Sequence, residues 1–326
     1  MFPHIYIEEE VLDHPKTQAI TERFPKAQRV PISRYTEVFN RKGQNFRLQK
    51  KQPALILAKK FKNFVLETPP GYGIGGKKNY YFSHMLNCIF DCRYCFLQGM
   101  YNSANYVIFV NFEDFTQAME ERISSEETYF FSGYDCDSLA LEPITHFAKG
   151  YLPFFAKHKK AFLELRTKST NIAFLQKTTP LSNCIVAFTL SPEEIVREYE
   201  HKTPSLKKRL AALKKLQEQG WPIGLRFDPL LYCEDFKEVY ARFFKEVFSV
   251  LQPTGIHSIT LGVFRLPKPF FKKMRGLYPK EKLFALVTEE GSTFSYPESL
   301  SQEMRAFCQE EVLKYIPETL LYSCEV

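Results

Sequence analysis

Short apolar runs alternate with amphipathic stretches along most of the chain from about residue 80 onward. Apolar runs bounded by turn residues predict strands over 79–86, 107–112, 128–133, 161–167, 184–190, 221–230 and 257–266. Apolar residues at helical spacing predict helices over 113–123, 205–220 and 235–251. Strands that alternate with helices indicate a parallel sheet with right-handed crossovers. The pattern therefore predicts an α/β fold with a partial (β/α)6 TIM-type barrel of parallel strands, and it places the chemistry at the C-terminal ends of these strands.

Residues at the ends of two helices sharpen their predicted limits. A stripe of four leucines over 205–220 ends at Gly220, the residue type expected at a C-terminal cap. After the strand at 184–190, Ser191 is expected to cap a helix in which Pro192 takes the first position and Glu194 completes a capping box. Each helix adjoins a predicted strand, as βα units require.

Residues 1–78 differ from the rest of the chain in being polar and irregular, with basic residues clustered between 41 and 62. The turn-rich segment PPGYGIGGKK at 69–78 marks a boundary. We therefore expect two parts. An irregular or α+β extension over 1–78 packs on a barrel over 79–326, which also carries C-terminal substrate-binding elements.

The composition of the 326 residues, 44% hydrophobic and 25% charged, is ordinary for a soluble globular protein and excludes disordered and collagen-like chains. A net charge of +7 favours polyanionic partners only weakly, because a basic surface that serves solubility accounts for it equally well. The N-terminus lacks the pattern of a secretory signal, and no apolar run is long enough to cross a membrane. We therefore expect a cytoplasmic protein with no membrane partner, whose eight cysteines are thiols or metal ligands.

Three cysteines form the strongest chemical signal. Cys88, Cys92 and Cys95 have the spacing C-x3-C-x2-C directly after a predicted strand. Three thiolates in one loop can bind one face of an iron–sulfur cube and leave one iron without a protein ligand. The alternative is a structural zinc site, with His84 as the fourth ligand. The remaining cysteines are scattered singly, and Cys184 is expected to be a core thiol; they are Cys136, Cys184, Cys233, Cys308 and Cys324.

The cysteine motif resembles that of the radical SAM superfamily, and further segments resemble the spore photoproduct lyase family over nearly the whole chain. These segments are Tyr94-Cys-Phe-Leu-Gln98 within the motif, Glu142-Pro-Ile-Thr-His146, the E-x-x-T-x-x-L-x-x-R pattern from Glu200 to Arg209, and the ending from Tyr315 to Tyr322.

The resemblance implies that Cys88, Cys92 and Cys95 hold a 4Fe-4S cluster whose open iron chelates S-adenosyl-L-methionine. It implies a lyase in which the 5′-deoxyadenosyl radical abstracts hydrogen from a thymine-dimer-type DNA lesion and reverses it. An external electron donor of the flavodoxin or ferredoxin type is implied as well.

The resemblance also assigns residues around the cofactor. Ser132 and Gly133 correspond to positions near the amino group of S-adenosyl-L-methionine, and Lys168 to a lysine that pairs with its carboxylate. Thr189 matches a family serine near the cofactor. Asp228 lies where the family lines the adenosine pocket. Here Arg226 and Asp228 are expected either to bind ribose together or to form a salt bridge with each other that caps the strand.

Two positions depart from the family in the step that quenches the product radical. The lyases use a cysteine as hydrogen donor, and Tyr134 takes its position here, with Cys136 two residues further on. Tyr94 matches the first of two tyrosines that flank the third cluster cysteine, whereas the second is Phe96. Tyr134 and Cys136 both remain candidates for the donor, and the Cys–Tyr–Tyr relay of the family is incomplete.

A basic segment at 265–282 follows the last predicted strand and contains interleaved aromatic residues. Its candidate contacts to nucleic acid are Arg265, Lys268, Lys272, Lys273 and Arg275. Bases for phosphates and aromatics for unstacked nucleobases favour DNA as a partner. A basic amphipathic helix packed on the barrel is the alternative.

The sequence thus favours a lyase of the spore photoproduct lyase type. A family paralogue with the same radical chemistry on a modified nucleotide or RNA base is the second hypothesis. The third is a non-catalytic nucleic-acid-binding protein with a structural zinc site. We expect a monomer, because no segment resembles a coiled coil.

Overall fold

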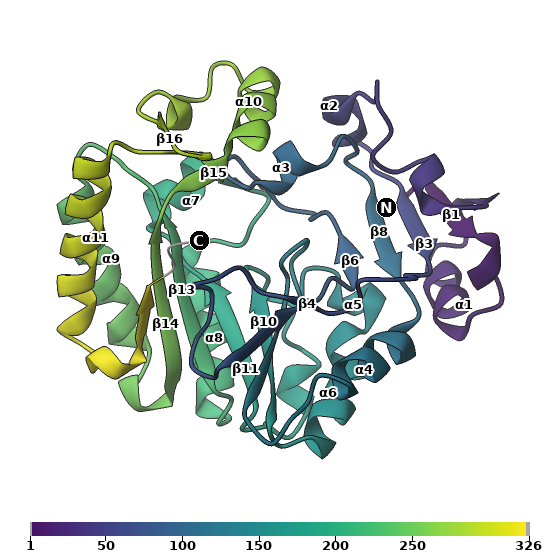
Figure 1. Ribbon diagram of the computed structural model, residues 1–326, viewed down its shortest axis with the longest axis horizontal. Helices are drawn as coiled ribbons and strands as arrows, with labels where there is room; N and C mark the ends of the chain where they lie inside the picture. The colour runs from purple at the N-terminus through teal and green to yellow at the C-terminus, as the bar shows by residue number, and fades with distance from the viewer. Residues whose placement is uncertain (1, 324–326) are drawn as a thin grey trace.

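The computed structural model describes residues 2–323, and in this part of the chain an eight-stranded sheet curls into a half-barrel (Figure 1). The strand order is β18-β14-β13-β11-β10-β9-β5-β4, and neighbouring strands are parallel except β4 and β5. The strands are β4 (Leu66–Glu67), β5 (Lys78–Tyr81), β9 (Thr128–Ser132), β10 (Ala161–Thr167), β11 (Cys184–Thr189), β13 (Ile223–Leu230), β14 (Ile256–Val263) and β18 (Leu321–Ser323). The predicted partial (β/α)6 barrel is confirmed in the run from β5 to β14.

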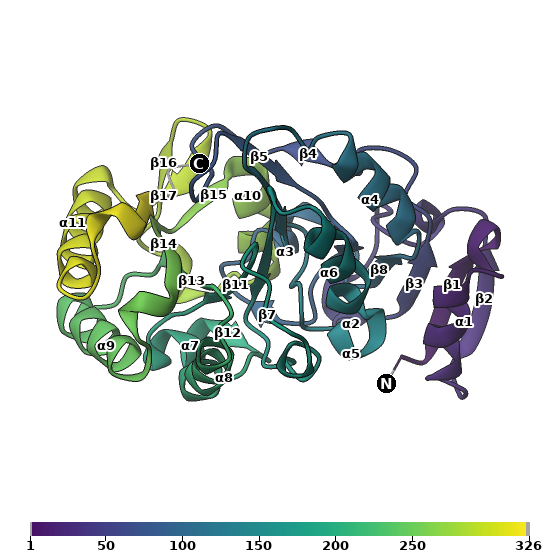
Figure 2. The same cartoon turned by 90° about the horizontal axis from the view of Figure 1, so that it is seen from below.

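Helices cover the outer face of this sheet (Figure 2). They are α4 (Phe112–Glu120), α6 (Phe147–Lys157), α7 (Glu193–Tyr199), α8 (Leu206–Glu218), α9 (Phe236–Val250) and α11 (Glu298–Leu313). Helix α8 follows the sequence closely: the Ser205 side chain accepts a hydrogen bond from the Lys208 N–H, the four leucines are buried, and Gly220 has a φ of +93°. Helix α7 differs, since it begins at Glu193 with Pro192 as its cap, and Ser191 makes no capping hydrogen bond.

A second sheet of five strands lies beside the barrel in the described chain, in the order β2-β1-β3-β8-β6. Its strands are β1 (His4–Glu8), β2 (Gln28–Ile32), β3 (Leu55–Ala58), β6 (Met85–Leu86) and β8 (Tyr106–Phe109), with the helices α1 (Pro15–Glu22) and α5 (Glu142–Thr145) packed against each other next to it (Figure 2). The run at 107–112, expected in the barrel, therefore belongs to this other sheet. The two strands β3 and β8 pair in parallel. Every residue of both strands is buried, so the apolar side chains on both of their faces are removed from solvent in this sheet.

Two other predicted strands are divided. The run at 79–86 gives β5 in the barrel and β6 in the second sheet, because the chain leaves the barrel after Tyr81. The run at 257–266 ends as β14 at Val263, and Arg265 then begins β15 (Arg265–Pro267), which pairs with β17 (Thr293–Ser295) beside β16 (Thr288–Glu290). Helix α10 (Lys268–Leu277) follows β15 and packs on the short helix α3 (Leu97–Met100) at the mouth of the barrel.

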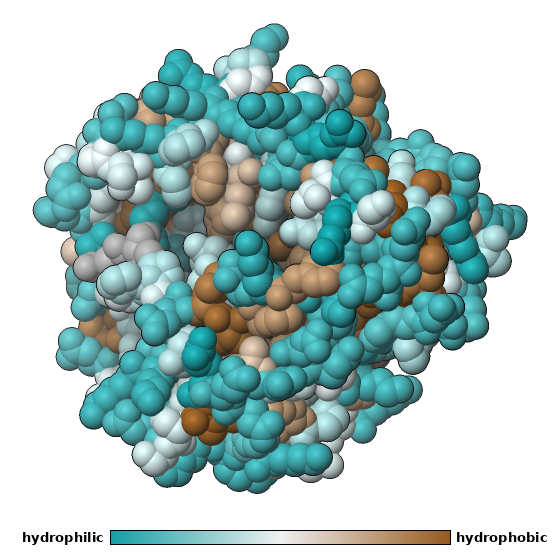
Figure 3. Space-filling model, turned by 45° about the vertical axis from the view of Figure 1, so that its right-hand side comes forward, coloured by the Kyte–Doolittle hydropathy of each residue, from teal (hydrophilic) through white to brown (hydrophobic). Residues whose placement is uncertain are grey.

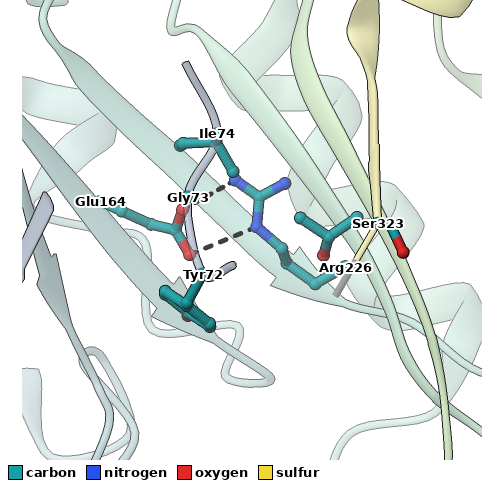
Figure 4. Close-up of a pocket in the computed structure, with 7 residues that line it drawn as sticks. Tyr72, Gly73, Ile74, Glu164, Arg226 and Ser323 are labelled. Atoms are coloured by element: carbon teal, nitrogen blue, oxygen red, sulfur yellow. Dashed lines mark hydrogen bonds and ion pairs between the residues drawn. The ribbon is translucent and has the colours of Figure 1, made fainter. Parts of the chain in front are cut away.

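The interior of the half-barrel is closed by a segment from the N-terminal part of the chain. Tyr72, Gly73 and Ile74 lie against the buried ion pair of Glu164 and Arg226, whose Oε2 and Nη2 are 2.7 Å apart (Figure 4). The cavity left between them measures about 10 Å³, roughly the space of one water molecule. This cavity is too small to hold a ligand the size of a nucleoside.

Within residues 2–323, no helix has the length and apolar character needed to span a membrane.

Candidate active site

The cysteine loop is held in place by Asn87, which is buried and adopts a left-handed φ of +75°. Its side-chain Nδ2 donates to the carbonyls of Ser103 (2.8 Å) and Asn105 (3.1 Å), and its Oδ1 accepts from the N–H of Cys88 (3.0 Å). Asparagine tolerates this backbone conformation better than most residues. Asn87 thereby fixes the direction in which the loop leaves the second sheet.

The three thiols of the loop are neighbours and form no disulfide. Burial raises the pKa of Cys88 to about 12, with further contributions from Asp137 and Cys95, and burial likewise raises the pKa values of Cys92 and Cys95. Lys168 opposes the shift at Cys92 and Cys95, so a cation faces the thiols. Soft thiolates beside a cation suit a cluster of net negative charge.

Among residues 2–323, no three His, Cys, Asp or Glu side chains are arranged to hold a single metal ion. A cube requires less convergence than zinc, because each thiolate binds a different iron. His84, the candidate fourth zinc ligand, has its ring stacked on Phe147 with centroids 3.7 Å apart, and its Nδ1 lies 3.9 Å from the Sγ of Cys136. The donor set present, three thiols in one loop, fits an iron–sulfur cube better than a four-ligand zinc site.

Cys92 lies in the short strand β7 (Asp91–Cys92), which pairs with β12 (Glu200–His201) so that Cys92 is opposite Glu200. The buried carboxylate of Glu200 accepts hydrogen bonds from the Tyr94 hydroxyl, the Arg209 guanidinium and the Ser191 hydroxyl, the last at 3.2 Å. Burial opposes its ionisation, but Arg209 and Lys168 outweigh that effect and hold the pKa of Glu200 below its usual value. This network fixes Tyr94 and the strand that carries Cys92.

Lys168 stands directly beyond the C-terminal end of β10, as predicted. Its ammonium Nζ is 5.4 Å from the ring centre of Tyr94. The buried Asp137 accepts hydrogen bonds from the Lys168 N–H (2.6 Å) and from the Thr167 hydroxyl (2.6 Å), and this fixes the turn that presents the lysine. The structure thus places Lys168 beside the cysteine loop, where a carboxylate of a ligand could pair with it.

Ser132 and Thr189 end their strands as predicted, but both side chains are buried. The Ser132 hydroxyl donates to the carbonyl of Glu164 at 2.6 Å, and the Thr189 carbonyl accepts from Arg209 at 3.1 Å. Gly133 follows Ser132 with a φ of +84° and is half-buried. The backbone at Gly133, rather than the Ser132 hydroxyl, is therefore the part of this pair that can face a ligand.

Replacing Gly133 with alanine should destabilise the fold by about 2–4 kcal/mol, because the new Cβ suffers both a left-handed φ and a steric clash. It would lie 2.8 Å from the Ser138 Oγ and 2.9 Å from the Arg166 carbonyl. Gly220→Ala is the matched control, since Gly220 has a similar φ but no atom within 4 Å of its added Cβ. Urea unfolding of both variants measures the difference, and equal losses would contradict the clash.

Asp228 and Arg226 do not pair with each other. Arg226 points into the barrel toward Glu164, whereas Asp228 lies 3.5 Å from Arg166 and 3.7 Å from Arg265. Asp228 therefore joins β13 to β10 and to the start of β15 at the mouth. The predicted salt bridge between Arg226 and Asp228 is therefore wrong, because each residue pairs with a different partner.

The two candidate hydrogen donors occupy different environments. The ring of Tyr134 lies at the mouth, 4.5 Å from the ring of Tyr81 and 5.5 Å from that of Phe96 in the cysteine loop. Cys136 is buried in the apolar core of the second sheet, next to His84. Burial raises the pKa values of both Tyr134 and Cys136, so each keeps its hydrogen at neutral pH.

The five side chains predicted to contact nucleic acid differ in whether another group of the protein already binds them. Lys273 Nζ donates to the Tyr101 carbonyl and the Asn102 Oδ1, both at 2.6 Å, and burial lowers its pKa. Arg265 pairs with Asp228, and Lys268 pairs with Glu289 at 2.5 Å. Lys272 and Arg275 are exposed and are absent from the ion pairs formed within residues 2–323. The amphipathic-helix alternative thus accounts for part of the basic segment.

Sequence reasoning assigned no role in this site to four residues, Lys50, Asp137, Glu200 and Arg209. Lys50 is buried and donates from Nζ to the Phe90 carbonyl at 3.2 Å, within the cysteine loop. Asp137 organises the turn of Lys168, and the Glu200–Arg209 pair supports Tyr94. An aspartate followed by two backbone N–H donors, as at Asp137, is a recognisable local signal, whereas nothing local points from Lys50 to a loop 40 residues away.

Comparisons with known proteins identify the family of this chain. The family model described as spore photoproduct lyase matches residues 1–322. Spore photoproduct lyase of Bacillus subtilis (strain 168) is 25% identical over 291 residues, which cover 86% of this chain and 83% of that protein. The enzyme of the same name from Clostridium acetobutylicum is 23% identical over 76% of this chain and 74% of its own.

A solved structure supports the same fold. A mutant of spore photoproduct lyase with bound AdoMet and dinucleoside spore photoproduct superposes with a TM-score of 0.85, covering 99% of this chain and 98% of that one at 19% identity. The match of the family model over nearly the whole chain decides the assignment. The chain belongs to the spore photoproduct lyase family.

Proposed function

We propose that this chain is a radical SAM lyase that reverses a thymine-dimer-type DNA lesion. The observation that carries the proposal is the position of three free cysteine thiols, Cys88, Cys92 and Cys95, beside Lys168 at the mouth of a half-barrel of this family. When bound there, a 4Fe-4S cluster supplies the electron that cleaves S-adenosyl-L-methionine to a 5′-deoxyadenosyl radical.

The residues of the chain bind and orient the reactants. Lys168 pairs with the cofactor carboxylate, which is a charge-assisted contact. The backbone at Gly133 and Thr189 borders the cofactor, and Asp228 lies on the side of the adenosine. The apolar surroundings of the loop exclude water from the radical.

Tyr134 is the residue that we assign to the last step. Its hydroxyl gives a hydrogen atom to the carbon radical of the product, so a C–H bond forms, an O–H bond breaks and a tyrosyl radical remains. The external electron donor, with one proton from solvent, returns that radical to tyrosine. Tyr134 is favoured over Cys136 because its half-buried ring contacts Phe96 of the cysteine loop, whereas the Cys136 thiol, although near Cys88, is buried beside His84.

Replacing Tyr134 with phenylalanine should lower the yield of repaired thymine per cofactor cleaved by about 10-fold or more, equivalent to ~1.4 kcal/mol. The ring and its packing stay, and only the transferable hydrogen is lost. Anaerobic reaction with a spore-photoproduct dinucleotide, followed by liquid chromatography of thymine and 5′-deoxyadenosine, gives both quantities. Cys136→Ala should leave the yield unchanged; the reverse pattern would assign the donor to Cys136.

The same residues support a second candidate, a family paralogue that acts on a modified nucleotide or RNA base. The observation in its favour is the combination of Tyr134 with Phe96, which differs from the donor arrangement of the lyases. The assay above distinguishes the two. Formation of 5′-deoxyadenosine with no repaired thymine would retain the radical chemistry and assign it to the other substrate class.

A further inference from the structure

The short helix α2 (Phe46–Gln49) belongs to the N-terminal part of the chain, and the residues at its end contact the cysteine loop. Lys50, at its end, is buried and lies 3.8 Å from Asp91, in addition to its hydrogen bond with Phe90. Gln49 accepts from the N–H of Ala104 at 2.9 Å. The helix is therefore fixed to the rim of the site, although it precedes the cysteines by 40 residues.

The segment that contains α2 also meets α10. The N–H of Asn102 donates to the Asn40 Oδ1 at 2.6 Å, and the Oδ1 of Asn102 accepts from Lys273 at 2.6 Å. Burial raises the pKa of Tyr278 to about 12, and the nearby charges of Arg93 and Arg47 oppose the shift, which places Arg47 beside the end of α10. In Figure 1 the two helices flank α3 at the same end of the molecule.

Exposed basic side chains occur on α10 and on the segment around α2, and we call this set the basic rim. All six are exposed, and none forms an ion pair within the described residues. Two of them, Arg41 and Lys42, line an open groove of about 390 Å³ together with Gln44 and Gln49. The basic rim consists of Arg41, Lys42, Arg47, Lys51, Lys272 and Arg275.

Leu48 lies between Arg47 and Lys51 in the chain and is exposed. Its side chain is 60% exposed, the largest value among the large hydrophobic residues of the described chain. Hydrophilic side chains cover most of the face seen in Figure 3, and apolar ones are gathered in separate patches. An exposed leucine between Arg47 and Lys51 has the chemistry of a side chain that enters a base stack while its neighbours contact phosphates.

We propose that the basic rim binds the backbone of duplex DNA across the mouth of the site, and that Leu48 fills the space left in the base stack when the lesion is extruded. The inference rests on the proposed function for its substrate. A lesion inside a duplex must leave the stack to reach the barrel mouth. A dinucleotide has no such stack, so Leu48 has no role in its repair.

Binding of fluorescent duplex DNA, measured by anisotropy across a salt series, tests the basic rim without any chemistry. Arg47→Ala with Lys51→Ala should weaken binding by about tenfold and lower the slope of log K against log salt by about 2, because two phosphate contacts are lost. Lys207→Ala with Lys214→Ala makes the same change in charge on α8 and should bind as wild type. Equal binding by the two double variants would overturn the proposal.

The wedge is tested by comparing two substrates. Leu48→Ala should lower kcat/KM by about tenfold for a lesion within a duplex and leave it unchanged for the dinucleotide. Leu12→Ala, a 41% exposed leucine outside this face, is the control. Equal losses on both substrates would mean that Leu48 has only a structural role. If no variant or wild type repairs either substrate, the proposed function fails, while the binding result stands separately.

Discussion

Replacing Cys92 with alanine should reduce cofactor cleavage by at least ~100-fold. Removing a residue that only hydrogen-bonds to a metal ligand lowers activity by about 10- to 100-fold, and removing the ligand itself should cost more. Cys92 is one of three thiols available to the cluster, and the half-barrel around it is held by other contacts. The fold should therefore persist without the cluster. Iron content and absorbance near ~400 nm report on the cluster, and chromatography of 5′-deoxyadenosine reports on cleavage.

Cys184→Ala is the matched control for this experiment. Cys184 is also a fully buried thiol, but it lies at the start of β11 in the core on the outer face of the sheet. It should retain its iron and its activity, with a loss of stability of about 1 kcal/mol. A Cys92→Ala protein with the iron content and cleavage rate of wild type would disprove the cluster assignment.

Replacing Arg209 with methionine should destabilise the fold by about 3–5 kcal/mol, since it leaves the Glu200 carboxylate buried without its partner. Arg209 and Glu200 have fully buried side chains, and the guanidinium also contacts Thr203 at 2.7 Å and the Thr189 carbonyl at 3.1 Å. Tyr94 loses a fixed acceptor at the same time, so the cysteine loop should also bind its cluster less well. Urea unfolding and iron content measure the two effects.

Arg197→Met is the control, because Arg197 pairs with Glu193 on the surface of α7 and its side chain is 78% exposed. Its loss should cost at most about 0.5 kcal/mol. The double variant Glu200→Gln with Arg209→Met should recover part of the stability, since the unpaired charge is gone. If Arg209→Met unfolds no more easily than Arg197→Met, the pair does not stabilise this site.

The limits of several elements could be predicted because the signals are local. The strand predicted over 161–167 has the same limits in the structure, and α8 begins and ends at the residues that Ser205 and Gly220 indicate. Periodicity does not reveal which sheet a strand joins, so the pattern predicts a strand over 107–112 but not its place in the second sheet. Ser191 stands where the sequence pattern predicts a helix cap, but its hydroxyl donates a hydrogen bond to the buried carboxylate of Glu200 instead.

In the candidate site, too, features formed by consecutive residues could be predicted, whereas contacts between distant parts of the chain could not. The cysteine spacing and the strand end at Lys168 can be read directly, because each lies in a few consecutive residues. Lys50 reaches the cysteine loop only through the tertiary fold, and so does the contact between Tyr134 and Phe96. The sequence shows two neighbouring lysines, but it does not show that Lys273 is hydrogen-bonded to Asn102 while Lys272 is exposed to solvent.

The segment at Tyr72–Ile74 has a consequence for the order of folding. It leaves the ribosome early, yet its partners in the barrel include Arg166, Arg226 and Thr260, which are synthesised between about 90 and 190 residues later. Contacts so distant in sequence slow folding, because a long loop must close before they form. The segment can contact Arg166 once β10 has been made, but its place in the barrel is complete only after β13 and β14 have supplied Arg226 and Thr260.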